Sequence, residues 1–247
     1  MSFLTLFNFT IIIPVMKMTV IRLGIILFSA IFVLSAFPVF PQSSAFGTVK
    51  GNPIEIYFTG RDLESRGQIQ EAENYYSQAV RICNDDIAQN NANRDTYTAL
   101  TWTLLRQKKY SDVIIWGERG IRFYADEFRI LETMGEAFFY LEDYDSSLRY
   151  MQRYANSLPM GDRVSIAYFF SGEIYRLQGK FFLADMAYST AVRLQPDIAL
   201  WWYRLGTVRE QAREFVPAVD AYEKALRLNS GYQAAAEGLA RARRAGQ

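Results

Sequence analysis

Glu132 and Glu136 form the residue pair best suited to chemistry in this sequence. They lie four positions apart, so one face of a helix would present both carboxylates. Such a pair could ligate a divalent cation or act as an acid and a base. The same spacing is more often found on a solvated or salt-bridged helix face, and we predict no metal site and no catalytic residue.

Other reactive groups are scarce. The 247 residues contain no histidine, which removes the commonest general base, the commonest metal ligand and every catalytic triad that uses an imidazole. Cys83 is the single cysteine and cannot form an intramolecular disulfide. No phosphate-binding glycine loop, dinucleotide fingerprint or nucleophile elbow occurs. We predict a protein that is not an enzyme and uses no cofactor, and the Glu132 and Glu136 pair is the one basis for a metal-dependent enzyme.

Charge also narrows the range of partners. The formal net charge of +1 provides no field that would steer the protein toward nucleic acid, so no nucleic-acid partner is predicted. Arg241, Arg243 and Arg244 near the C-terminus could meet an anionic partner. Basic residues in a final helical turn are already favoured by the helix dipole, and this is the interpretation that we prefer.

Residues 3–40 are almost entirely apolar, and no comparable run occurs later in the chain. Read from Met16, the segment has the three parts of a secretory signal. The parts are a basic start at Lys17 and Arg22, an apolar stretch over Leu23–Phe37 and an end rich in proline and small residues over Pro38–Ala45. We predict that residues 1–47 are a signal sequence or membrane anchor with Met16 as the functional start, and that residues 48–52 are a linker.

An uncleaved segment would act as a membrane tether through residues 23–40, because about 18 apolar residues are just enough to span a bilayer. Lys17 and Arg22 would then stay on the cytoplasmic side. Both outcomes export the rest of the chain across the cytoplasmic membrane. We therefore predict a periplasmic or membrane-anchored protein whose folded part lies outside the cytoplasm.

From Pro53 onward the sequence repeats itself. Aromatic, glycine and alanine positions of the segment 165–198 recur 34 residues later. The recurring pairs are Tyr168 and Trp202, Gly172 and Gly206, Ala184 and Ala218, Tyr188 and Tyr222, and Ala191 and Ala225. Spacings of i, i+3, i+4 and i+7 mark one helix face, and a second such face follows in each copy. Each repeat is therefore predicted to be a helical hairpin.

These residues resemble the tetratricopeptide repeat (TPR) signature, W-x2-L-G-x2-Y followed by A-x3-F and then A and P. The resemblance implies an all-α fold over 53–247, a right-handed superhelical solenoid of five hairpins. The five copies cover 53–86, 94–127, 128–161, 165–198 and 199–232, and a capping helix is expected over 232–244. The second copy departs most, with Thr101, Val113 and Gly117 where the family prefers Gly, Ala and an aromatic residue.

The resemblance also implies a concave groove lined by the first helix of each repeat. A second stripe of aromatic and charged residues runs along those helices, away from the hairpin contact. The predicted groove residues are Tyr57, Arg61, Trp102, Glu132, Glu136, Phe139, Phe169, Glu173, Arg176 and Tyr203. Among their aromatic side chains, Trp102 and Phe139 are expected to be the most exposed.

Aromatic pockets with a polar rim suit the anchoring of a peptide. The expected function is an exported scaffold or adaptor that binds a protein or peptide ligand, in envelope assembly or secretion. A carboxylate clamp of Asn and Lys or Arg, known in some family members, is not recognisable at the equivalent positions. The alternative is a structural solenoid that associates with itself.

Overall fold

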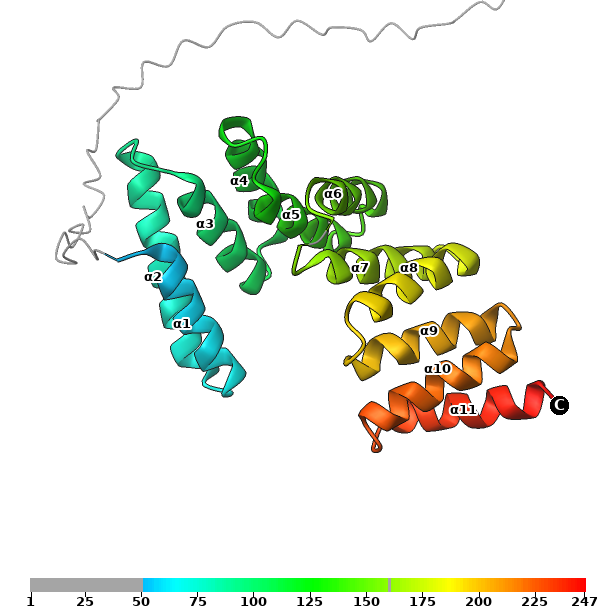
Figure 1. The fold of residues 1–247 in the computed structure, drawn as a ribbon. Helices are drawn as coiled ribbons and strands as arrows, with labels where there is room; N and C mark the ends of the chain where they lie inside the picture. The colour runs from blue at the N-terminus through cyan, green and yellow to red at the C-terminus, as the bar shows by residue number, and fades with distance from the viewer. Residues whose placement is uncertain (1–50, 160) are drawn as a thin grey trace, which may run out of the picture. The chain divides into compact units, whose positions relative to one another are not determined.

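The computed structural model describes residues 51–159 and 161–247 (Figure 1). Over these residues the chain forms eleven α helices and no strand. The helices are α1 (Pro53–Ser65), α2 (Ile69–Ala88), α3 (Arg94–Arg106), α4 (Tyr110–Phe123), α5 (Phe128–Tyr140), α6 (Tyr144–Ser157), α7 (Val164–Leu177), α8 (Phe181–Leu194), α9 (Ala199–Gln211), α10 (Phe215–Leu228) and α11 (Gln233–Ala245). The predicted all-α class is confirmed.

The predicted signal sequence or membrane anchor, 1–47, lies outside the described residues. Within the helices from α1 to α11, none combines the length and the apolar content that a membrane crossing requires.

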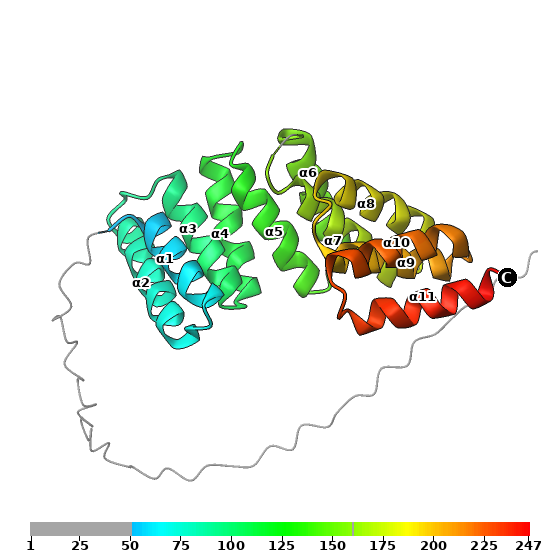
Figure 2. The ribbon, with the colours of Figure 1, turned by 60° about the horizontal axis from the view of Figure 1, so that its bottom comes forward.

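The helices pair into five consecutive hairpins, from α1 with α2 to α9 with α10, and α11 follows (Figure 1 and Figure 2). Each second helix also packs against the first helix of the next hairpin. The hairpins therefore stack in chain order, as in a solenoid, and each hairpin contacts the hairpins before and after it. The handedness of the superhelix stays a prediction.

The first helices of neighbouring hairpins also touch each other, in the pairs α1 with α3, α3 with α5 and α5 with α7. Over the described part of the chain, the second helices of neighbouring hairpins have no comparable contact. Rows that are closer on one side must bend toward that side. We call the side formed by α1, α3, α5, α7 and α9 the inner face.

Close approach within a hairpin depends on glycine. A Cβ added at Gly172 would lie 2.7 Å from ring carbons of Tyr188, and one at Gly206 would lie 2.7 Å from those of Tyr222. Both tyrosines are completely buried. The glycine on the first helix therefore makes room for the aromatic ring on the second, which explains why the two residues recur together.

In the second hairpin the glycine lies on the second helix and not on the first. Thr101 stands on α3 in place of glycine, and its hydroxyl donates to the backbone carbonyls of Tyr97 and Thr98 at 2.9 and 3.0 Å. Gly117 on α4 leaves space for Met134, whose side chain would lie 2.6 Å from an added Cβ. The departure from the TPR pattern is therefore compensated by a side chain from the next hairpin.

The end of the chain covers the last hairpin. α11 packs on α10 and α9, with Ala235 and Ala242 buried against Tyr222. Arg241 donates to Glu210 at 2.8 Å, and Arg243 donates to Glu223 at 2.7 Å. These two arginines bind α11 to the preceding hairpin, which favours their structural interpretation over an anionic partner.

Candidate functional site

A cavity of about 220 Å³ opens on the inner face where the first three repeats meet. We call it the inner hollow. It is lined by Tyr57, Phe58 and Arg61 of α1, Trp102, Leu105 and Arg106 of α3, Glu132, Thr133 and Glu136 of α5, and Arg163, which directly precedes α7. Five of the ten predicted groove residues thus lie around one cavity, although they are spread over 80 positions of sequence.

One wall of the inner hollow is aromatic. The ring of Tyr57 lies 5.2 Å from that of Trp102, and the ring of Phe58 lies 5.9 Å from Trp102 in an edge-on arrangement. Tyr57 is buried, Trp102 is half-buried, and Phe58 keeps 53% of its surface exposed. Phe58 is therefore the member of the wall that is open to a ligand.

The inner hollow is also lined by an acidic pair, Glu132 and Glu136. Glu132, only 2% exposed, accepts a hydrogen bond from Nη2 of Arg163 at 2.8 Å. Oε2 of Glu136 lies 3.7 Å from the same nitrogen. The sequence interpretation of a salt-bridged pair is thus the correct one for Glu132 and Glu136, with Glu132 buried and Glu136 half-buried.

Glu136 has an unusual protonation equilibrium. Burial, together with the negative charge of Glu132, raises the pKa of Glu136 to about 7, against the opposing influence of Arg163, Arg106 and Arg61. Its carboxyl group therefore changes charge close to neutral pH. The charge of the inner hollow changes with it.

The arginines of the inner hollow differ in their partners. Arg106 donates to both carboxylate oxygens of Glu64, with Nε to Oε2 at 3.1 Å. Arg163 is held by Glu132. Arg61 donates to the hydroxyl oxygen of Tyr57 at 3.0 Å, and no carboxylate of the described residues forms an ion pair with it. Arg61 is therefore the cation that remains available.

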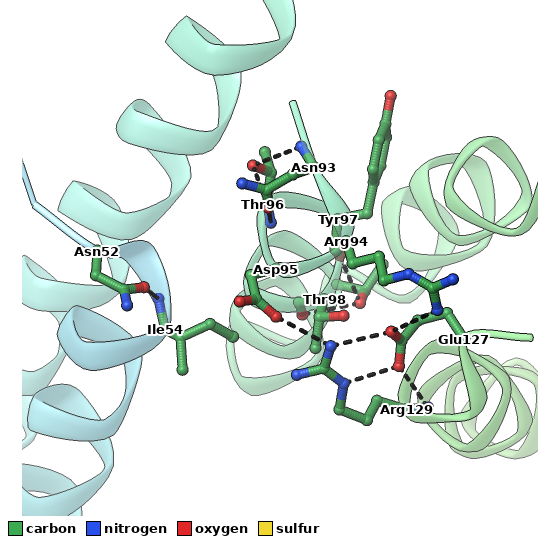
Figure 3. A network of polar contacts seen from close by, with 11 residues as sticks. Asn52, Ile54, Asn93, Arg94, Asp95, Thr96, Tyr97, Thr98, Glu127 and Arg129 are labelled. Carbon is green, nitrogen blue, oxygen red and sulfur yellow. Dashed lines mark hydrogen bonds and ion pairs between the residues drawn. The ribbon is translucent and has the colours of Figure 1, made fainter. Parts of the chain in front are cut away.

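Arg129, at the start of α5, has no such freedom (Figure 3). Its guanidinium bonds both oxygens of Glu127, at 2.7 and 2.9 Å, and reaches Asp95 at 3.0 Å. Glu127 also lies 3.9 Å from Arg94. This network occupies Arg129 in joining α3 to α5, so its side chain is a structural element of the second and third repeats.

The inner face of the fourth and fifth repeats is closed. Glu173, 6% exposed, accepts a hydrogen bond from the Tyr188 hydroxyl at 2.6 Å. Arg176 and Arg204 each lie 2.7 Å from one of its oxygens. Burial and the Glu173 charge raise the pKa of Tyr188 well above its ordinary range, so the phenol stays a donor. Glu173, predicted for the groove, joins the fourth repeat to the fifth through Arg204, and Arg176, also predicted for the groove, pairs with it along α7.

Three predicted groove aromatics are also packing residues. Phe169 stacks on Trp201 of the next repeat at 5.2 Å, and Tyr203 lies 5.0 Å from Tyr232. Phe139 meets Phe170 edge-on at 5.0 Å. Trp102 and Phe139 are half-buried beneath neighbouring rings, as are Phe169 and Tyr203, so the expectation that these two are the most exposed groove aromatics stays a prediction.

Three important members of the inner hollow lie outside the predicted groove residues, namely Phe58, Arg106 and Arg163. Phe58 lies one position beyond the predicted stripe, and Arg106 is the last residue of α3. Arg163 belongs to the segment between the third and fourth copies, outside the repeat frame. A signal for Arg163 was present, since an arginine in an insertion between otherwise regular repeats has no role in the periodic core.

No metal centre is formed by the part of the chain that the structure describes. Among residues 51–159 and 161–247, no three side chains of His, Cys, Asp or Glu come close enough together to hold an ion. The Glu132 and Glu136 pair has Arg163 where a cation would sit.

No protein-family model matches the chain, and no curated protein matches its sequence. Solved structures do match. MamA AMB-1 is 18% identical with a TM-score of 0.54 over 72% of this chain and 92% of that chain. The MamA RS-1 ArsTM double mutant is 14% identical with a TM-score of 0.58 over 73% and 96%. The structure of Cut9 with Hcn1 is 12% identical with a TM-score of 0.55, over 77% of this chain and 42% of that chain.

These structures contain TPR solenoids. The described chain has the TPR fold. At identities of 18% or less, the similarity concerns the path of the helices and not the residues of a site. The inner hollow of this TPR solenoid therefore has to be interpreted from its own side chains.

Proposed function

We propose that this protein is a non-catalytic scaffold that binds a segment of a partner protein at the inner hollow. The observation that supports this most is the meeting of Tyr57, Arg61, Trp102, Glu132 and Glu136 around one cavity. A half-open aromatic wall beside charged groups is the arrangement that anchors peptide side chains and selects among them. Assembly with another chain occurs for the structural neighbour Cut9, found with Hcn1 in a hetero-tetramer.

The partner is tested by crosslinking from a residue on the rim. A photo-reactive phenylalanine analogue in place of Phe58 is expected to capture the partner in living cells, because this side chain is 53% exposed beside the cavity. The same analogue in place of Phe182, 76% exposed on α8, is the matched control. Capture from position 182 and not from position 58 would contradict the proposal.

A second arm of the test removes the aromatic wall. Trp102→Ala is expected to abolish capture from position 58, while circular dichroism confirms that the variant is folded. Capture of a second copy of this chain from position 58 would instead favour the self-associating solenoid, and light scattering across protein concentration would verify that outcome.

We propose that the scaffold works after export across the cytoplasmic membrane, with a role in envelope assembly or secretion. The support is the sequence of residues 1–47, with its basic start and its apolar stretch. Alkaline phosphatase fused after Gln247 should be active, because this enzyme needs an oxidising compartment. An inactive but intact fusion would place the folded part in the cytoplasm. Mass spectrometry of the isolated protein reports whether the segment is cleaved.

A further inference from the structure

Ion pairing around the inner hollow leaves one arginine without a carboxylate partner among the described residues. Three arginines and two glutamates line it, namely Arg61, Arg106, Arg163, Glu132 and Glu136. Arg106 is paired with Glu64 and Arg163 with Glu132. Arg61 is exposed and has the Tyr57 hydroxyl as its hydrogen-bond partner, so most of its donors stay open to a ligand.

The open cation lies next to the open aromatic ring. Arg61 and Phe58 are three positions apart on α1, which places both on one side of that helix, and both line the same cavity. Leu105 adds a further apolar contact. A ligand that presents a negative group beside an apolar side chain would meet both features at once.

We propose that the inner hollow binds a carboxylate of a partner peptide, with Arg61 as the anchoring cation and Phe58, Trp102 and Leu105 covering the adjacent apolar side chain. This inference rests on the proposed scaffold function and names the chemistry of its ligand. A carboxylate suits the site because a guanidinium donates two parallel hydrogen bonds to it. The carboxylate can belong to an internal Asp or Glu or to a C-terminus.

Glu136 makes this binding sensitive to pH. Charged and titratable groups face Glu136 from each neighbouring segment, and their sum decides the sign of the effect. They are Tyr57 and Arg61 of α1, Arg106 of α3, Glu132 and Tyr140 of α5, and Arg163 before α7; Tyr110 of α4 stacks on Tyr140. Arg106 is paired with Glu64, so the charged groups, with Glu64 included, sum to zero with Glu136 ionised and to +1 with Glu136 protonated. An anionic ligand therefore binds more tightly as the pH falls through about 7.

The test uses full-length protein in detergent micelles and immobilised dodecapeptides in a Gly-Ser frame. One peptide carries a central Glu-Phe pair with blocked ends, the second carries Gln-Phe with blocked ends, and the third carries Gln-Phe with a free C-terminal carboxylate. At pH 6 we expect a carboxylate-bearing peptide to bind about tenfold more tightly than the blocked Gln-Phe peptide, as a charged hydrogen bond provides. The preferred peptide identifies which carboxylate is used.

Two variants report on the mechanism. Arg61→Gln should remove the preference for a carboxylate, whereas Arg119→Gln, an exposed arginine on α4 of the outer side, should leave it unchanged. Between pH 6 and pH 8 the wild type should lose several-fold in affinity, and Glu136→Gln should bind at pH 8 as tightly as the wild type does at pH 6.

Equal binding of the three peptides, no binding of any, or an unchanged preference in Arg61→Gln would overturn the carboxylate site. The scaffold function would survive these results if crosslinking from position 58 still captured a partner and Trp102→Ala abolished that capture. Loss of both would remove the two proposals together.

Discussion

The two ends of the inner face carry similar residues but use them differently. In the first three repeats, Tyr57, Trp102 and Glu136 surround a cavity. In the last two, Phe169 stacks on Trp201 and Glu173 is held by Arg176, Arg204 and Tyr188. Tyr57, Trp102, Glu136, Phe169 and Glu173 all belong to the same periodic stripe. The difference shows that the neighbouring repeat, and not the stripe itself, decides whether a groove residue is open.

The physical origin of the difference lies in the source of the arginines. Arg204 comes from the regular helix of the next repeat and reaches Glu173 directly. Arg163 comes from the segment between α6 and α7, which is longer than the segment between α8 and α9. It pairs with Glu132 from the edge of the cavity and leaves the space in front of Arg61 unfilled.

The largest expected effect is on the closed end. Glu173→Ala should lower the free energy of unfolding by about 3 kcal/mol, because it removes the carboxylate that pairs with Arg176 and Arg204 and accepts the Tyr188 hydrogen bond. Urea denaturation measures this loss. Glu223→Ala is the control, since its ion pair with Arg243 is exposed and is expected to matter little. A loss below about 1 kcal/mol for Glu173→Ala would mean that this carboxylate is not a structural element.

At the open end, removing the charge of Glu136 should stabilise the protein, whereas removing Glu173 at the closed end destabilises it. The pKa of Glu136 is raised to about 7 in the folded protein, so the folded state holds the proton more tightly than the unfolded chain. The stability from this proton is complete below about pH 4.5 and is lost as the pH rises to about 7. Glu136→Gln should therefore be more stable than the wild type at pH 8, by on the order of 2 kcal/mol.

Thermal unfolding of both proteins from pH 5 to pH 8 tests this, with Glu118→Gln, an exposed carboxylate on α4, as the control. A stability difference that does not change with pH would show that Glu136 does not titrate in this range. It would also remove the pH dependence that we infer for binding.

Aromatic side chains at the two ends should differ in their contribution to stability. Phe169→Ala should cost about 2 kcal/mol, because it removes a ring stacked on Trp201 at 5.2 Å. Phe58→Ala should cost less than about 0.5 kcal/mol, as expected for a side chain that is 53% exposed. Urea denaturation of the two variants compares them. If Phe58→Ala proves as damaging as Phe169→Ala, Phe58 is part of the core and not of a binding wall.

Substitutions in the turns of the hairpins should raise stability slightly, and they test whether the two ends unfold together. The turns that close the hairpins use a residue at positive φ, which is glycine at Gly67 and Gly179 but Glu142 in the third repeat and Arg213 in the fifth. Glu142→Gly and Arg213→Gly should each stabilise the protein by roughly 0.5–1 kcal/mol, since glycine adopts this conformation without strain. Calorimetry should show one shifted transition for both. A shift confined to part of a split transition would mean that the ends unfold separately.

Much of the fold could be predicted from the sequence. The recurrence of Gly172 and Tyr188 at Gly206 and Tyr222 implies hairpins of fixed geometry, because a ring on one helix needs a glycine on the other. The stripe containing Tyr57, Trp102 and Glu136 could also be read from helical spacing. Both patterns are local, since the residues of one helix face are one or two turns apart and the glycine and its tyrosine belong to one hairpin.

The candidate site could be predicted only in part. Sequence spacing brings Tyr57, Arg61, Trp102, Glu132 and Glu136 to one face, but it treats Phe139, Phe169, Glu173, Arg176 and Tyr203 in the same way. Nothing in a single helix reveals that Phe169 will meet Trp201 or that Glu173 will meet Arg204. Arg163 lies outside the repeat frame, so no periodic argument reaches it.

The sequence alone determined the helical repeat, because residues that must share a helix face or fit one another within a hairpin are close in the chain. The tertiary structure alone decided which part of the inner face is a cavity and which is a packed interface. That choice depends on contacts between repeats, where a side chain such as Arg163 or Arg204 meets a carboxylate about 31 positions away. The tertiary structure also raises the pKa of Glu136, because its burial among charges from three repeats exists only after the repeats have stacked.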